Sequence, residues 1–207
     1  MAKPRTSGLY SVHPGLAMVQ KWITDLPAKT GRSLEEWIEF VKKQGPAGEK
    51  ERRAWLKAEH KLGTNSASWI AERAEGKGSE EDSPEAYLQA AEEWVEAMYS
   101  GAKKDLRPIH DGLLKLGLRI GKDVKACPGK TAVPFYRNHV FAQIKPTTNT
   151  RVDLGLALGR TKAPMRLIDT GGYEKKDRIT HRIPISKVSD IDDDVKGWLK
   201  KAYEMDA

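Results

Sequence analysis

The sequence has a single cysteine, Cys127, among its 207 residues. One cysteine excludes a disulfide within the chain and any zinc site built from several cysteines. Long apolar runs are also missing, because no stretch approaches the ~18 consecutive apolar residues that a membrane-spanning helix requires. Residues 1–15 contain basic side chains with no apolar stretch after them, so we expect no secretory signal. Together these absences predict a soluble cytoplasmic protein with no membrane partner.

Motifs for catalysis and for cofactor binding are scarce as well. The five histidines show neither the H-E-x-x-H pattern nor another paired ligand spacing, so no metal site is predicted. The stretch CPGKT (127–131) resembles the end of a phosphate-binding loop, but Val124 stands where that loop needs its first glycine. A hairpin turn explains the Pro-Gly pair better, and Cys127 is interpreted as a small buried residue. We therefore expect binding rather than catalysis, with no cofactor and no catalytic residue.

Charge of one sign is unevenly spread along the chain. The net charge is +7, yet residues 1–82 contribute 14 Lys and Arg against 12 Asp and Glu, a difference of +2. Residues 103–182 contribute 18 against 7, a difference of +11. A basic middle region favours anionic partners, namely nucleic acid, phosphorylated metabolites or acidic protein surfaces. The alternative is a lysine-rich surface that only contacts water.

A stretch of glycine, serine and charged residues, EGKGSEEDSP (75–84), divides the chain. We place a helical domain at residues 1–76, a linker at 77–83 and a second domain at 84–207. Before the linker, apolar residues recur at spacings of three and four, which predicts four helices around one core. Ser33 with Glu36 forms a capping box that starts the second helix, and the third helix is expected at about 49–62.

The second domain is expected to be α+β. Ser83-Pro84 predicts the start of one helix, a second follows at about 106–120, and an aspartate-led helix closes the chain. Between them the hydrophobic period changes to two in five short stretches: AVPFYR, HVFAQIKP, RVDLGLAL, MRLID and THRIPIS. The connections are too short for crossover helices, so the sheet should be mainly antiparallel with flanking helices.

The stretch HKLGTNSASWIA (60–71) has the layout of a helix-turn-helix DNA reader, with Gly63 at the turn. Acidic residues follow on the same helix, and the basic region that such a reader needs lies in the other domain. Thr64 or Asn65 also has a simpler role as the N-cap of the helix that follows Gly63. We interpret the stretch as a packed corner, and contact between residues 60–75 and DNA stays open.

Two predicted strands supply the candidate site. In residues 151–159 the three leucines point to one face of the strand. Asp153, Gly155 and Ala157 point to the other face, which is left open because glycine and alanine have little side-chain volume. In residues 180–185, His181 points with the two isoleucines, where it is either a satisfied core residue or a proton carrier. Arginine side chains that converge beside the open face would suit phosphate or carboxylate, and the alternative is a set of surface salt bridges. The candidate anion-binding residues are Arg137, Arg151, Asp153, Thr180, His181 and Arg182.

Two segments carry a resemblance to known families. LPAKTGRSLEEWIEF and the residues after it, up to about position 71, resemble a small helical domain of unknown function found in many bacterial proteins. RVDLGL and THR…WLKKAY resemble an uncharacterised domain that is often labelled a predicted transport protein. The two domains commonly occur fused in this order. The resemblance implies a bacterial two-domain protein, and it assigns no reaction to the recurrent polar residues.

Two ranked hypotheses follow from the sequence, and a protein-interaction adaptor that uses the exposed face of the helical domain is a third possibility. The first is a non-enzymatic binding protein for an anionic partner, with nucleic acid bound by the basic α+β domain and the helical domain assisting. The second is a small-molecule anion site, or a minor enzyme, on the open face of the sheet, where His181 or Asp153 would handle a proton. The sequence sets neither the identity of the ligand nor the oligomeric state.

Overall fold

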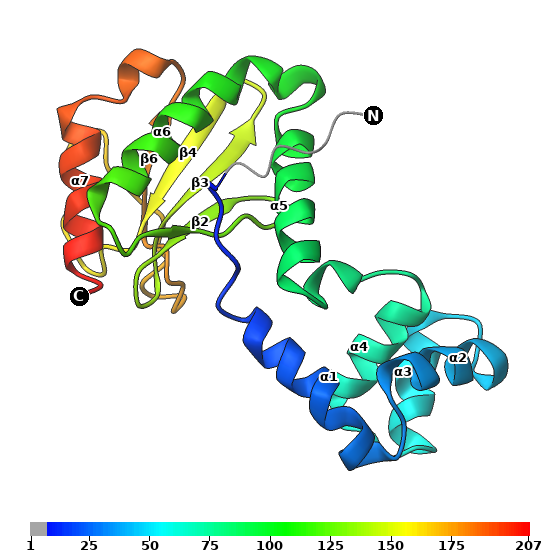
Figure 1. Ribbon diagram of the computed structural model, residues 1–207. Helices are drawn as coiled ribbons and strands as arrows, with labels where there is room; N and C mark the ends of the chain where they lie inside the picture. Colours follow the sequence, from blue (N-terminus) through cyan, green and yellow to red (C-terminus); the bar gives the residue numbers. More distant parts are fainter. Residues whose placement is uncertain (1–7) are drawn as a thin grey trace. The chain divides into compact units, whose positions relative to one another are not determined.

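The computed structural model describes residues 8–207, so the start of the N-terminal stretch, residues 1–7, lies outside the described residues. The described chain divides into two compact units: a helical unit of residues 12–90, and a sheet unit formed by residues 8–11 with 91–207. The division falls within one long helix, between Ala90 and Ala91. Figure 1 shows the course of the chain through both units.

The helical unit is built from four helices around one core. Their bounds are α1 Leu16–Thr30, α2 Leu34–Gln44, α3 Glu49–Ala58 and α4 Thr64–Ala74. The predicted capping box is present, because the Ser33 hydroxyl accepts from the Glu36 amide at 3.2 Å and the Glu36 carboxylate accepts from the Ser33 amide at 2.7 Å. The core includes Trp37, Val41 and Ile70, all buried. The expected four-helix arrangement is therefore confirmed.

Two boundaries near the third helix differ from the sequence prediction. Helix α3 ends at Ala58 rather than near residue 62, and Lys61 beyond it adopts a left-handed conformation with φ 56°. Helix α4 begins at Thr64, and its N-cap is Gly63, which has no side chain to cap the helix. The expectation that Thr64 or Asn65 caps it is therefore wrong. Ile70 is fully buried, as the packed-corner interpretation predicts.

The sheet unit follows the order that the hydrophobic periods predict. The long helix α5 Pro84–Met98 leads into it, and the Ser83 hydroxyl caps that helix by accepting from the Ala86 amide at 3.1 Å. Its other helices are α6 Arg107–Ile120 and α7 Asp193–Glu204. The strands are β1 Lys125–Ala126, β2 Val133–Tyr136, β3 Val140–Thr148, β4 Arg151–Leu156, β5 Ile168–Asp169 and β6 His181–Ile185. Short 3-10 turns lie at 79–81, 101–106 and 188–190.

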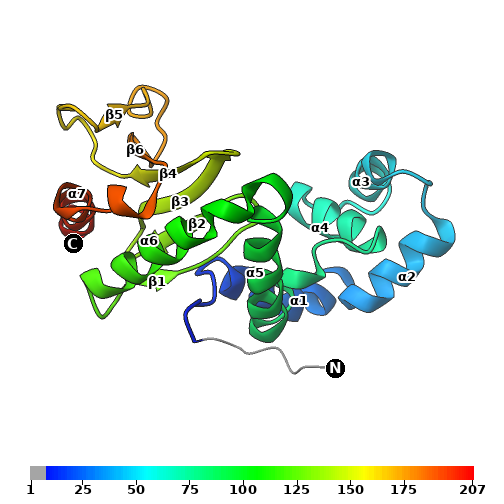
Figure 2. The ribbon, with the colours of Figure 1, turned by 90° about the horizontal axis from the view of Figure 1, so that it is seen from above.

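The six strands form one sheet in the order β1-β2-β3-β4-β6-β5, and every neighbouring pair is antiparallel. The strand labels follow this order in the view from above (Figure 2). The α+β class with an antiparallel sheet is thus confirmed. Strand β5 is only two residues long, shorter than the stretch MRLID suggested, and it forms one edge of the sheet.

One face of the sheet is packed by helices. Helices α6 and α7 both contact β3 and β4, and Figure 1 shows α6 running across the strands. Leu154, Leu156 and Ile183 are fully buried beneath these helices together with Leu113 of α6 and Leu199 of α7. We call this the core face and the opposite side of the sheet the outer face.

The fit of α6 on the core face depends on a glycine. A Cβ atom on Gly117 would lie 2.3 Å from the ring of Phe135, which is fully buried on β2 and has no free space to move into. Gly197 on α7 is exposed, and a Cβ atom there meets no atom within 4 Å. Both glycines are in helices, so they form a matched pair.

We expect Gly117→Ala to lower the free energy of unfolding by about 1–3 kcal/mol, because overpacking outweighs the gain in helix propensity. Gly197→Ala should raise it by up to ~1 kcal/mol, since only the propensity term acts there. Urea unfolding of both variants measures these changes. Equal stabilisation by the two alanines would show that α6 does not approach β2 this closely.

Candidate functional site

The register of the strands determines which side chains share the outer face. Lys145 of β3 is paired with Asp153 of β4, and Gln143 is paired with Gly155, which is in turn paired with Arg182 of β6. Alternate residues of a strand point to opposite faces, so all five belong to the face opposite the buried leucines. The predicted division of β4 into an apolar and a polar face is present in the structure.

Asp153 lies at the centre of this face and is held from three directions. Its Oδ2 accepts from Arg182 Nη1 at 2.8 Å and from Thr147 Oγ1 at 2.8 Å. Arg151 donates from Nη2 to Oδ2 at 3.4 Å, and its Nε lies 2.9 Å from Oδ1 as an ion pair. The Asp153 side chain is 9% exposed, whereas those of Arg151 and Arg182 are 30% and 32% exposed. One buried carboxylate therefore fixes two guanidinium groups that remain open to solvent.

The electrostatic balance of this cluster is positive. Two arginines and one aspartate carry a net charge of +1, and Lys145 adds a further positive charge across the strand pair. Within residues 8–207, Lys145 makes no ion pair. Cross-strand neighbours have Cβ atoms about 5 Å apart, so Lys145 lies beside Asp153 and its two arginines.

A hollow of 620 Å³ lies on the outer face beside this cluster. Its lining comes from four strands and from the loop that precedes β6: Pro134, Val140, Gln143, Lys145, Thr147, Asp153, Gly155, Thr170, Asp177, Arg178, Ile179 and Arg182. We call it the outer-face hollow. It places Asp153 and Arg182 at a common cavity, and Arg137 is not among its lining residues.

The outer face is less open at Gly155 than the sequence suggested. A Cβ atom on Gly155 would lie 2.8 Å from Ile179 Cγ2 and 2.9 Å from Gln143 Cγ. Residues 177–180, which we call the covering segment, therefore pack on the depression that this glycine leaves. Arg178 of the same segment donates from Nε to the Val140 carbonyl at 2.8 Å. The expected low, open surface is thus partly covered, and the hollow lies beside the covering segment.

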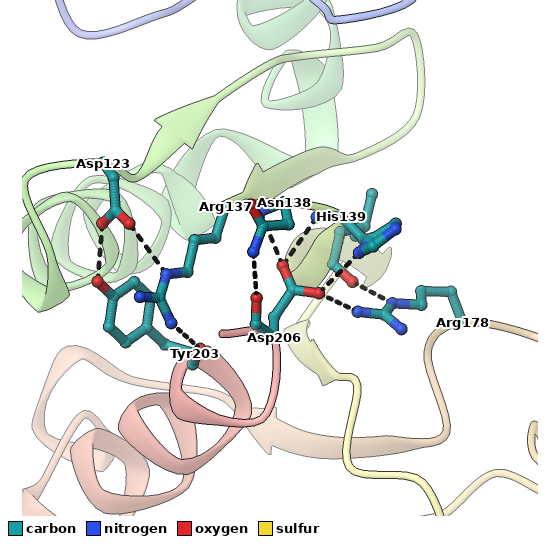
Figure 3. A network of polar contacts seen from close by, with 8 residues as sticks. Asp123, Arg137, Asn138, His139, Arg178, Tyr203 and Asp206 are labelled. Carbon is teal, nitrogen blue, oxygen red and sulfur yellow. Dashed lines mark hydrogen bonds and ion pairs between the residues drawn. The ribbon is translucent and has the colours of Figure 1, made fainter.

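Arg137 lies in a different cluster, at the C-terminal end of α7 (Figure 3). It donates from Nε to Asp123 Oδ2 at 2.9 Å, and its guanidinium lies 4.4 Å from the centre of the Tyr203 ring. The hydrogen bond from Tyr203 lowers the pKa of Asp123 most, and the hydrogen bond from Arg137 lowers it further. Arg137 was expected to converge with the other arginines, and the structure instead gives it these partners.

Asp206 connects the end of α7 to two loops (Figure 3). Its side chain is 2% exposed and accepts from the backbone amides of Asn138 at 3.0 Å and His139 at 2.8 Å. The same carboxylate pairs with Arg178 of the covering segment. Asp206 therefore fixes the position of Arg178, whose side chain remains 50% exposed.

Thr180 and His181 belong to the interior rather than to an anion site. His181 is fully buried on the core face, where its Nε2 lies 2.9 Å from the Thr161 carbonyl. A carbonyl can only accept, so Nε2 carries the proton and Nδ1 accepts from the Thr180 hydroxyl at 2.9 Å. Thr180 Oγ1 in turn accepts from the Leu158 amide at 3.1 Å. Both ring nitrogens of His181 and the hydroxyl of Thr180 therefore have hydrogen-bond partners. This supports His181 as a satisfied core residue and gives no support to a proton carrier.

His110 is a second buried histidine, on α6. It is fully buried, its Nε2 lies 3.4 Å from the Tyr10 hydroxyl, and its ring lies 4.8 Å from that of Tyr99. Within residues 8–207, Nδ1 has no hydrogen-bond partner. Asp111 does not orient this ring, because its carboxylate pairs with Arg107 at 2.9 Å. Burial lowers the pKa of His110 to about 4, although the charges of Asp111 and Glu96 act in the opposite direction.

The thiol of Cys127 gives no sign of an activated nucleophile. It is 1% exposed, and burial raises its pKa to about 12. In the part of the chain that the structure describes, no group of three or more His, Cys, Asp or Glu side chains is placed to hold a metal ion. No helix among residues 8–207 is both long and apolar enough to cross a membrane.

Sequence reasoning missed several residues of the outer face. Lys145 and Thr147 alternate along HVFAQIKPTT with the buried Ile144, so the period of two could have placed them opposite the core. Arg178 and Ile179 lie in a loop without periodicity, and no local signal shows that this loop folds back on β4.

Two regions of the chain match protein families. Residues 95–206 match a family described as a domain of unknown function (DUF5655), and residues 18–76 match another so described (DUF4287). These matches support an uncharacterised protein of two domains in the expected order. No curated protein and no solved structure matches the chain significantly.

The buried His110 predicts a pH-dependent stability. Its pKa falls from 6.5 to about 4 on folding, so between these values the unfolded chain binds more protons and stability is lost as the pH drops. The full loss is about 3 kcal/mol. Urea unfolding at several pH values should show that His110→Leu removes this part of the dependence. Identical pH profiles for the variant and the wild type would contradict the assignment.

Proposed function

The chain belongs to the family described as a domain of unknown function (DUF5655), and we propose that it is a binding protein for phosphate-bearing polyanions, with nucleic acid as the ligand class. The site is the outer face of the sheet around Asp153. Transport and a bacterial source stay expectations from the resemblance, and phosphate binding on this face requires neither. A cytoplasmic location, expected from the composition, is compatible with such a ligand.

The observation that carries the proposal is the pair of arginines fixed by one buried carboxylate. Arg151 and Arg182 both contact Asp153, which is itself 9% exposed. A guanidinium has five N–H donors in a rigid fork that matches phosphate oxygens, and contact with one carboxylate leaves several of these donors for a ligand. Because the two forks are already positioned, less side-chain entropy is lost on binding.

The spread of the cations favours a polyanion over a single small anion. Lys145, Arg151 and Arg182 lie on three successive strands, β3, β4 and β6. Neighbouring strands are about 4.8 Å apart, so the three cations cover a width of about 10 Å, which is more than one phosphate group can contact. The excess of +11 over residues 103–182 adds a long-range attraction for the same ligand class.

A small anionic ligand in the outer-face hollow is the second candidate. Its support is the cavity itself, in which Gln143 and Arg182 offer donors. A reaction that uses His181 as the proton carrier has lost its support, because this histidine is buried and both ring nitrogens have partners. Asp153, the other expected proton carrier, is engaged by Arg182 and Thr147, so the geometry supports this candidate as a binding site without a reaction.

Titration of a labelled oligonucleotide with the full chain tests the proposal. We expect affinity to fall steeply between about 50 and 200 mM salt, because each phosphate contact releases counterions. Arg182→Gln and Arg151→Gln should each lower the affinity by about fivefold to tenfold and reduce the salt slope by about one contact.

The matched control is Lys43→Gln, which makes the same charge change on the exposed surface of α2 in the helical unit. It should leave the affinity within about twofold of the wild type, because Lys43 lies outside the unit that carries the proposed site. Absence of binding to single-stranded and duplex DNA at low salt would refute the proposal. Equal effects of Lys43→Gln and Arg182→Gln would place the site elsewhere.

A further inference from the structure

A second hollow, of 720 Å³, also borders the covering segment. Small residues form part of its lining, and the rest consists of one aromatic ring, a methionine and charged side chains. The lining residues are Ala157, Gly159, Arg160, Tyr173, Glu174, Lys176, Asp177, Arg178, Thr180 and Met205. We call it the tyrosine hollow. Its chemistry differs from that of the outer-face hollow, because the latter contains no aromatic ring.

Tyr173 is the feature of this hollow that calls for a ligand. Tyr173 is an aromatic residue with 43% of its surface exposed, and Met205, which lines the same hollow, is 53% exposed. The guanidinium of Arg160 lies 4.5 Å from the centre of the Tyr173 ring, so one flat cation and one flat ring are held together. Gly159 leaves open space at the wall, since a Cβ atom there meets no atom within 4 Å. Aromatic rings and guanidinium planes are the two surfaces on which proteins stack unpaired nucleobases.

Two residues belong to both hollows. Asp177 and Arg178 line the tyrosine hollow and the outer-face hollow alike. Arg178 is fixed by Asp206 and by the Val140 carbonyl, and half of its side chain stays exposed. The guanidinium of Arg178, with the Asp177 carboxylate next to it in the chain, therefore lies between the surface that would bind phosphates and the surface that would bind a ring.

We infer that the polyanion is single-stranded nucleic acid, whose phosphates lie on Arg182 and Arg178 while an unpaired base stacks in the tyrosine hollow on Tyr173 and Arg160. This inference rests on the proposed function, because the phosphate contacts are those of the outer face. A duplex satisfies the same cations, but its bases are stacked on one another and offer no free ring face to Tyr173. The stacking therefore adds a preference for single strands that charge alone does not supply.

The test compares three labelled ligands of about 12 nucleotides, a length within the usual range for single-strand sites. They are a single-stranded DNA, an abasic strand with the same phosphates and no bases, and the corresponding duplex. We expect the full chain to bind the single strand at least about fivefold more tightly than the abasic strand, because a stacked base contributes measurably to affinity. The duplex should bind more weakly than the single strand.

Variants of the tyrosine separate stacking from charge. Tyr173→Leu keeps an apolar side chain on an exposed site and should remove the preference for bases while leaving abasic binding unchanged. Tyr173→Phe keeps the ring and should retain the preference. Arg182→Gln should weaken the single strand and the abasic strand by the same factor.

The outcomes distinguish this inference from the proposed function. Equal binding of the single strand and the abasic strand would overturn base stacking while the phosphate site stands. Tighter binding of the duplex than of the single strand would also overturn it. If none of the three ligands binds at low salt, the proposed function itself fails. A preference for bases that survives Tyr173→Leu would place the stacking surface elsewhere and overturn the assignment to this hollow.

Discussion

Asp153 lies on a strand whose alternate residues are buried beneath α6 and α7, and it is held there by Arg151 and Arg182. The position follows from the pleat of β4, which sends Leu154 and Leu156 into the core and leaves Asp153 and Gly155 on the opposite face. A shift of the register by one residue would turn the carboxylate toward the core and the leucines toward the outer face, so the core determines where the charged cluster lies. The positive character of the outer face is a consequence of how the core is packed.

The rest of the outer face is organised around the same strand. Gly155 leaves room in which Ile179 packs, and this contact brings the covering segment down onto the sheet. Arg178 of that segment is then fixed by Asp206, which also accepts from two backbone amides after β2. Arg151, Arg178 and Arg182 are thus held by buried carboxylates rather than by flexible surface contacts. Groups held in this way lose little freedom when a ligand binds.

The sequence was sufficient for the parts of the structure that depend on local periodicity. Alternation along residues 151–158 predicted the two faces of β4, and the capping box predicted the start of α2. The sequence was insufficient to predict contacts between segments that are far apart in the chain. Arg137 follows a β-bulge between Phe135 and Tyr136 and lies against the end of α7, and no pattern of residues in β2 indicates that partner.

The covering segment shows the same limit for a loop. Residues 170–180 contain no hydrophobic period, so the packing of Ile179 on Gly155 could not be read from the sequence. His181 illustrates the intermediate case. Its direction followed from alternation, whereas the satisfaction of its two nitrogens depends on Thr161, which is 20 residues away in the chain. The candidate site was therefore predicted for its strand residues and missed for its loop residues.

The central claim is that phosphate is bound by the two arginines that hold Asp153. The most direct measurement follows the side-chain Nε–H signals of the arginines by NMR while a single-stranded oligonucleotide is added to the full chain. The account predicts that the signals of Arg151 and Arg182 shift together and reach saturation at the same ligand concentration. Arg137, which is engaged with Asp123 and Tyr203, should shift little. Unchanged signals of Arg151 and Arg182 at saturating ligand would contradict it.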